Sequence, residues 1–174
     1  MSNAKINHPK PKILFRVLFA LITLAVMTVI FMLSAENAQQ SADTSAGVIE
    51  KVAETFVPSY KKMQVYEKQQ FVSSLQDAVR KAAHFSVFAA LGVSVACFAS
   101  TFKAKPLLKL ILCELFCCIY ALSDEYHQTF SEGRSFQLSD IATDSLGSLC
   151  GILLVFFTVY IFTKIKEKSS SKRF

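Results

Sequence analysis

Residues 141–162 read IATDSLGSLCGILLVFFTVYIF, a run long enough to cross a lipid bilayer as one helix. A spanning α-helix needs about 20 mostly apolar residues, and Asp144, near the start of this run, is its one charged side chain. Gly147 and Gly151 follow on the same helical face, where small residues let another membrane helix approach closely. The stretch therefore predicts a membrane-spanning helix with a polar end and a face that packs against a second helix.

The composition of the whole chain also indicates a membrane protein. Its 174 residues are 52% hydrophobic and include 16 phenylalanines. The mean hydropathy of +0.39 is too high for an ordinary soluble domain. The 5 cysteines all fall in apolar runs, where we expect them to pack as small hydrophobic groups. We therefore expect an all-α integral membrane bundle.

Three more runs resemble 141–162 in length and composition, namely residues 13–33, 82–102 and 106–123. The sequence thus predicts four transmembrane helices. The run 106–123 is slightly short and carries Glu114 near its middle. Because no basic residue lies at the same depth, we expect Glu114 either to be protonated or to hydrogen-bond a polar group of a neighbouring helix.

The basic residues predict how the chain is oriented in a bacterial cell membrane. Lysine and arginine are concentrated in residues 1–12, in the link 103–105 and in the tail 163–174, whereas 34–81 is balanced and 123–140 is acidic. Basic segments stay in the cytoplasm, so we expect both termini there and both longer links outside. The net charge of +6 comes from the cytoplasmic ends and indicates contact with anionic lipid rather than with nucleic acid.

The long link 34–81 contains two amphipathic patterns. Residues 34–45 are small and polar and predict a loop. Apolar residues then recur at helical spacing up to Pro58, and again from Phe71 onward. We expect two short helices at the outer bilayer surface, the second running directly into the span at 82–102. They either fix the link or offer a surface to a partner in the cell envelope.

Polar residues gather at the outer ends of three predicted spans. Residues 124–144, DEYHQTFSEGRSFQLSDIATD, supply most of them, and the helix that leads into the span at 82–102 supplies Lys81 and His84. The predicted topology brings them to one level of the membrane. The candidate functional residues are Lys81, His84, Asp124, Glu125, Gln128, Arg134, Asp140 and Asp144, with Gly147 and Gly151 as helix-packing residues.

This cluster has a structural interpretation and functional ones. Charges close to hydrocarbon are costly, and they persist by pairing or by lining a wet cavity. In the structural interpretation, Lys81 or Arg134 pairs with one of the two aspartates of the fourth span and clamps the helix ends together. The two aspartates are Asp140 and Asp144. The carboxylates outnumber the bases, however, which favours binding of a cation, a basic ligand or a sugar, or acid–base chemistry.

Different classes of function remain open. A binding protein would hold a lipid head group, a cell-wall precursor or a glycopeptide in the cluster. An enzyme acting on a lipid or envelope precursor would use Asp124 or Glu125 as general base and His84 as general acid or metal ligand. Lys81 and Arg134 would then hold an anion. An ion path is less favoured, because few polar residues lie at mid-membrane. The sequence contains no compact metal-ligand motif, so we assign no metal ligand, and it identifies no cofactor.

The same residues carry a resemblance to a known family. RKAAHFSVFAALG (80–92) and YALSDEYHQTFSEGRSFQLSDIATDSLGSLCG (120–151) resemble the VanZ-like family of bacterial membrane proteins. Glu114 departs from the family pattern, which has an apolar or small residue there. The pattern falls on Arg80, Lys81, His84, Phe85, Asp124, Glu125, Gln128, Phe130, Arg134, Asp140, Asp144, Gly147 and Gly151, and a serine-spaced stretch falls on Ser34, Ser41 and Ser45.

The resemblance extends over about residues 13–162 and implies a four-helix membrane bundle. For the namesake of the family it implies low-level resistance to glycopeptide antibiotics of the teicoplanin type. It assigns no reaction, and such proteins occur widely in bacteria without a role in resistance. The partners we expect are the lipid bilayer and a lipid-linked envelope precursor or a glycopeptide.

Overall fold

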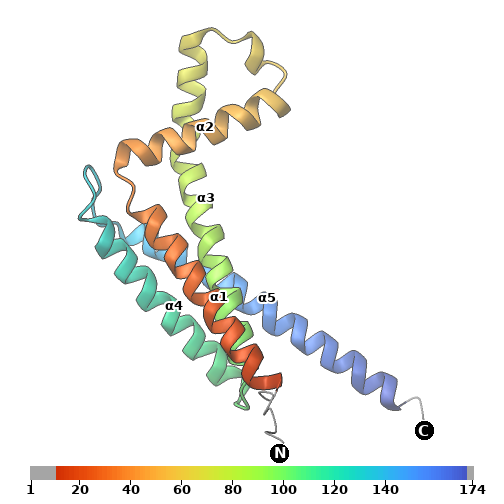
Figure 1. Ribbon diagram of the computed structural model, residues 1–174. Helices are drawn as coiled ribbons and strands as arrows, with labels where there is room; N and C mark the ends of the chain where they lie inside the picture. The colour runs from red at the N-terminus through yellow and green to blue at the C-terminus, as the bar shows by residue number, and fades with distance from the viewer. Residues whose placement is uncertain (1–10, 172–174) are drawn as a thin grey trace, which may run out of the picture.

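The computed structural model describes residues 11–171, and the regular secondary structure of this part of the chain is α-helical apart from one short 3-10 helix (Figure 1). Four of the helices are long and apolar enough to cross a membrane, which confirms the predicted all-α architecture. The elements are α1 (Pro11–Ser34), α2 (Ala38–Phe56), η1 (Tyr60–Lys62), α3 (Val65–Ser100), α4 (Pro106–Gln128) and α5 (Leu138–Ser171).

Helix α3 lies at the centre of the bundle and contacts α1, α2, α4 and α5. Phe88 and Leu91 of α3 are fully buried in the core. They belong to one cluster with Ile30 of α1, Cys117 of α4 and Ile152 of α5. The burial of Cys117 agrees with the expectation that the thiols pack as small hydrophobic groups. Many other large apolar side chains of these helices are exposed, as lipid-facing residues of a membrane bundle would be.

Glycines bring the backbones of α3 and α5 into contact. Gly147 lies against the carbonyl oxygen of Phe85, and Gly151 lies against that of Ala89, so a Cβ atom at either glycine would clash with α3. From the other side, Gly92 of α3 meets the backbone of α5 in the same way. This packing, within one chain, fixes the register of α5 on α3. It therefore also fixes which polar residues of the two helices face each other.

Helix α2 begins earlier than the sequence analysis predicts. Residues 38–45 are helical rather than a loop. The Asn37 side chain accepts a hydrogen bond from the Gln40 backbone nitrogen at 2.8 Å, and the Gln40 side chain accepts one from the Asn37 nitrogen at 3.1 Å. This capping box satisfies two backbone donors at the helix start, which offsets the weak helix propensity of the small residues behind it. The end of α2 at Phe56, before Pro58, agrees with the prediction.

Helix α2 lies across α3 at one end of the bundle, and α3 extends past the crossing (Figure 1). We call this the polar end. The 36 residues of α3 form one helix, which confirms that the second amphipathic segment runs directly into a span. Val48, Val52 and Phe56 are exposed and follow one another at intervals of four residues, so they form an apolar stripe on α2.

Candidate functional site at the polar end

The predicted cluster lies where the end of α4 and the start of α5 meet the interior of α3. Asp124, Glu125 and Gln128 are buried in the last two turns of α4. Asp140 and Asp144 lie in the first two turns of α5. Both helices continue beyond the purely apolar runs of the sequence, so these residues are held by regular helix rather than by a loop. Their positions are therefore set by helix packing, which suits a site of defined geometry.

A hydrogen-bond network holds Asp124 in place. The Ser34 hydroxyl, at the end of α1, donates to Asp124 Oδ2 at 2.7 Å, and the Gln128 amide donates to the same oxygen at 3.1 Å. Arg134 Nη1 in turn donates to Gln128 Oε1 at 2.6 Å. Ser34 is fully buried and Asp124 is 3% exposed, so the network lies inside the protein. It ties α1 to the end of α4 and to the link that follows.

Glu125 holds the end of the link 129–137, which joins α4 to α5, by a hydrogen bond to its backbone. Its Oε1 accepts a hydrogen bond from the backbone nitrogen of Gln137 at 2.6 Å. The link turns at Gly133, whose φ of 77° is in the left-handed region that favours glycine. The other carboxylate oxygen, Oε2, is buried and has no hydrogen-bond partner among the described residues. Glu125 therefore has a structural contact on one oxygen and a free acceptor on the other.

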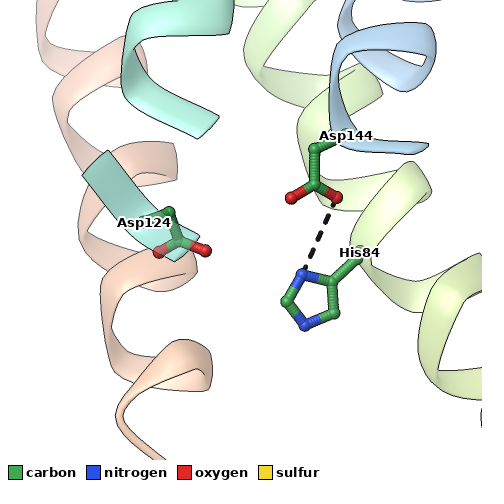
Figure 2. Close-up of side chains that lie close together, drawn as sticks. All are labelled: His84, Asp124 and Asp144. Atoms are coloured by element: carbon green, nitrogen blue, oxygen red, sulfur yellow. Dashed lines mark ion pairs between the residues drawn. The ribbon is translucent and has the colours of Figure 1, made fainter. Parts of the chain in front are cut away.

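Asp144 and His84 face each other between α5 and α3 (Figure 2). The dashed line joins Asp144 Oδ1 and His84 Nδ1, which are 3.8 Å apart. This distance is short enough for an ion pair when His84 is protonated but too long for a hydrogen bond. Neither these atoms nor Asp144 Oδ2 have a hydrogen-bond partner in residues 11–171. Asp124 points toward the same space from α4, and one ligand-type atom from each of the three residues lies within 4.8 Å of the others.

Basic residues of α3 pair with Asp140 at the rim of the cluster. Arg80 Nη2 lies 3.9 Å from Asp140 Oδ2, and Lys81 Nζ lies 4.0 Å from Asp140 Oδ1. These pairs fit the clamp interpretation for Asp140. The Lys81 side chain is 43% exposed and that of Arg80 is 24% exposed, so Arg80 is the more buried of the two. Arg80 was not among the cluster residues predicted from the sequence. Burial, followed by the nearby charge of Arg80, lowers the pKa of the Arg134 guanidinium.

A cavity of about 210 Å³ opens beside the cluster. Its walls combine two guanidinium groups and the two carboxylates of Asp77 and Asp140 with hydroxyl and amide groups, and they come from four helices and the α4–α5 link. The cavity is therefore polar, and both carboxylates lie within ion-pair distance of Arg80, whereas Arg134 forms no ion pair among the described residues. Besides the two carboxylates, the side chains that give the cavity this polar character are Ser41 and Ser45 of α2, Arg80 of α3, Gln128 of α4 and Arg134 of the link.

A smaller cavity of about 70 Å³ lies next to the first. It shares Ser41, Ser45 and Arg80 with the larger cavity and adds Ser34 and His84. The sequence analysis gave these serines no role beyond the family resemblance. In a helix, the spacing of four residues places Ser41 and Ser45 on one face. This signal could not be used because the segment was expected to be a loop, in which residues do not share a face.

The remaining polar residue of the spans, Glu114, lies near the middle of α4 and apart from the cluster. It accepts a hydrogen bond from the Ser148 hydroxyl of α5 at 3.2 Å, and the Cys118 thiol contacts its other oxygen at 3.4 Å. Of the two alternatives that the sequence analysis left open, the contact with a neighbouring helix is therefore observed.

A family model described as VanZ/LLP1 matches residues 19–162 of the chain. The match includes the four membrane-span helices and every residue of the cluster. This chain belongs to the VanZ/LLP1 family. Comparisons with curated proteins and with solved structures gave no match. The resemblance seen in the polar motifs is thus confirmed, and the protein is a VanZ-like membrane protein whose family motifs converge at the polar end of the bundle.

Proposed function

We propose that this VanZ-family protein binds the anionic head group of an envelope lipid or lipid-linked cell-wall precursor in the larger cavity. The observation that carries the proposal is the presence of Arg134, which forms no ion pair among the described residues, on the wall of that cavity. Arg80 lies on the same wall, 3.7 Å from Asp77 and 3.9 Å from Asp140. A guanidinium group presents a planar fork of donors that matches phosphate and carboxylate oxygens. The Nε atom of Arg134 is buried without a hydrogen-bond partner among the described residues, so it is available to such a ligand.

The proposal places the cavity on the outer face of the bacterial cell membrane. The basic residues of the link 103–105 and of the end of α5 support this orientation, since both lie at the opposite end of their helices from the cavity. The apolar stripe of α2 also supports it, because a helix with such a stripe is suited to lie in the interface next to the cavity. The head group of a lipid in the outer leaflet would then reach the arginines laterally, from the membrane interface.

The size of the cavity bears on the link with glycopeptide antibiotics. A volume of about 210 Å³ lies below the roughly 300–1,000 Å³ of sites for drug-sized ligands, so it suits a head group rather than a whole glycopeptide. We therefore expect an effect on teicoplanin to arise from a changed display of lipid or precursor.

Expression of the wild type in a susceptible bacterium should raise the inhibitory concentration of teicoplanin. Expression of R134Q to the same level should leave that concentration unchanged.

Binding can be tested directly on the full-length protein in detergent. Short-chain phosphatidylglycerol serves as the anionic probe and short-chain phosphatidylcholine as the comparison. We expect the anionic lipid to bind more tightly, and R80Q or R134Q to weaken its binding at least about tenfold, as expected for a lost charge-assisted hydrogen bond. K61Q removes an exposed charge outside the cavity and should bind as the wild type does. Equal binding of both lipids, or wild-type binding by R134Q, would contradict the proposal.

A second candidate is an enzyme that acts on the same class of ligand. The observation that favours it is the presence of free, buried carboxylate oxygens on Glu125 and Asp144 next to the cavities, where they can accept a proton. Mass spectrometry of lipids and cell-wall precursors in a deletion strain separates the two functions. A species that accumulates on deletion and disappears on complementation by the wild type, but not by D144N, would favour the enzyme. An unchanged profile would favour binding alone.

A further inference from the structure

We propose that His84, Asp124 and Asp144 together bind one divalent transition-metal ion between α3, α4 and α5. The three side chains converge from the three helices (Figure 2), and one donor atom of each lies within 4.8 Å of the others. One imidazole nitrogen and two carboxylate oxygens suit ions such as Mn²⁺, Fe²⁺ and Zn²⁺. The imidazole makes Ca²⁺ and Mg²⁺ less suitable, since these ions prefer oxygen ligands alone.

Asp144 provides an observation that is independent of this clustering. Its side chain is 1% exposed, and neither carboxylate oxygen has a hydrogen-bond partner in residues 11–171. A buried carboxylate without partners is costly, so such groups are normally paired, hydrogen-bonded or bound to metal. The nearest side chain, His84, is itself buried at Nδ1 without a hydrogen-bond partner in the same range. One cation between them would satisfy both groups.

The ion pairs at the rim do not supply this partner. Arg80 and Lys81 lie 3.9 Å and 4.0 Å from Asp140, one helical turn before Asp144. Arg134 is hydrogen-bonded to Gln128 instead. The arginines and the lysine around the cluster are therefore directed to other acceptors, and the ion pair that Asp144 has among the described residues is the one with His84, which requires a protonated imidazole.

Asp124 is oriented as metal-binding carboxylates usually are. The hydrogen bonds from Ser34 and Gln128 both end on Oδ2, which leaves Oδ1 as the oxygen for an ion. Hydrogen bonds of this kind hold a ligand in position and are a regular feature of metal sites. Ser34 would thus be a positioning residue, which acts on the ion through Asp124.

The site leaves space for a further ligand. Metal–ligand bonds of about 2.0–2.2 Å place neighbouring ligand atoms about 3–4 Å apart, so the three donors would have to move together by about 1 Å. Three protein ligands leave coordination positions for water or for a bound molecule. Ser34 and His84 line the smaller cavity, which shares its walls with the larger one, so such a ligand could enter from there. The inference does not depend on the proposed lipid ligand, because its test measures the metal alone.

The test is the metal affinity of the full-length protein, purified in detergent without an affinity tag. Mn²⁺ is the main probe because thiolates, which this chain could form at its 5 cysteines, prefer softer ions such as Zn²⁺. After chelator treatment and titration with Mn²⁺, elemental analysis should find about one ion per chain, and the ion should raise the unfolding temperature in a chelator-reversible way. H84A and D144N should weaken binding by more than about 100-fold, because the loss of a direct ligand must exceed the effect of an outer hydrogen bond.

Two further variants control this experiment. E114Q removes a carboxylate of α4 outside the cluster and should bind Mn²⁺ as the wild type does. S34A keeps all three ligands and should weaken binding about 10–100-fold, so it tests the site even where D144N does not fold. The proposal is overturned by a wild type that shows no saturable Mn²⁺ binding, or by D144N and S34A proteins with wild-type affinity.

Discussion

At the scale of the residue, the cluster contains polar groups of two kinds. Asp124 and Asp140 have partners that hold them in place, a serine and an amide for the first and basic side chains for the second. Asp144 and one oxygen of Glu125 are buried without hydrogen-bond partners among the described residues. A clamp explains the first kind, and it extends to Asp144 only through the 3.8 Å ion pair with a protonated His84. The second kind is what a binding site requires, because a free acceptor is available to a ligand.

Glu125 allows a test at this scale. E125A removes the acceptor of the Gln137 backbone N–H, and a lost hydrogen bond to a charged group costs about 1.5–3 kcal/mol. We expect faster amide hydrogen exchange across residues 129–137 and a lower unfolding temperature. E125Q keeps an acceptor at the same position and should restore most of the protection. Exchange in E125A as slow as in the wild type would show that the link is held by other contacts.

At the scale of the element, most of the helices were predicted from the length of the apolar runs and from apolar residues at helical spacing. These patterns predicted the spans and the direct passage of the second amphipathic segment into α3. They missed the start of α2, because the small and polar composition of residues 34–45 predicts a loop, whereas Asn37 followed by Gln40 three residues later is the pattern of a capping box. They placed His84, Asp124 and Asp144 in one cluster of eight residues, but they did not predict that these three converge within it. These residues come from three helices, and only the packing of α5 on α3 and α4 brings them together.

The contact between α3 and α5 is testable with two glycines. In G151A the added methyl group meets the Ala89 carbonyl oxygen, so the helices must separate, and overpacking of this kind costs about 1–3 kcal/mol. Gly47, inside α2, has open space around its Cβ position, so G47A should stabilise by up to about 1 kcal/mol through helix propensity. Thermal unfolding in detergent compares the two. A G151A protein as stable as the wild type would contradict the close backbone contact.

At the scale of the whole molecule, the bundle combines a lipid-facing exterior with a polar end built from four helices and one link. The orientation proposed for it predicts the location of its ends. Green fluorescent protein fused after Phe174 should fluoresce, because that reporter folds in the cytoplasm, and alkaline phosphatase inserted in the link near Lys61 should be active outside. The reverse pattern of reporter activity would place the polar end in the cytoplasm and exclude an outer-leaflet ligand.

The central claim is that the polar cluster serves a ligand rather than the stability of the bundle. Thermal unfolding of D144N in detergent with chelator tests it most directly. Asp144 is buried and its oxygens have no hydrogen-bond partner in the described range, so neutralising it removes a desolvation cost. We predict an unfolding temperature equal to or above that of the wild type in chelator, with the rise caused by Mn²⁺ lost. An unfolding temperature several degrees below that of the wild type in chelator would contradict the claim and identify Asp144 as part of a structural clamp.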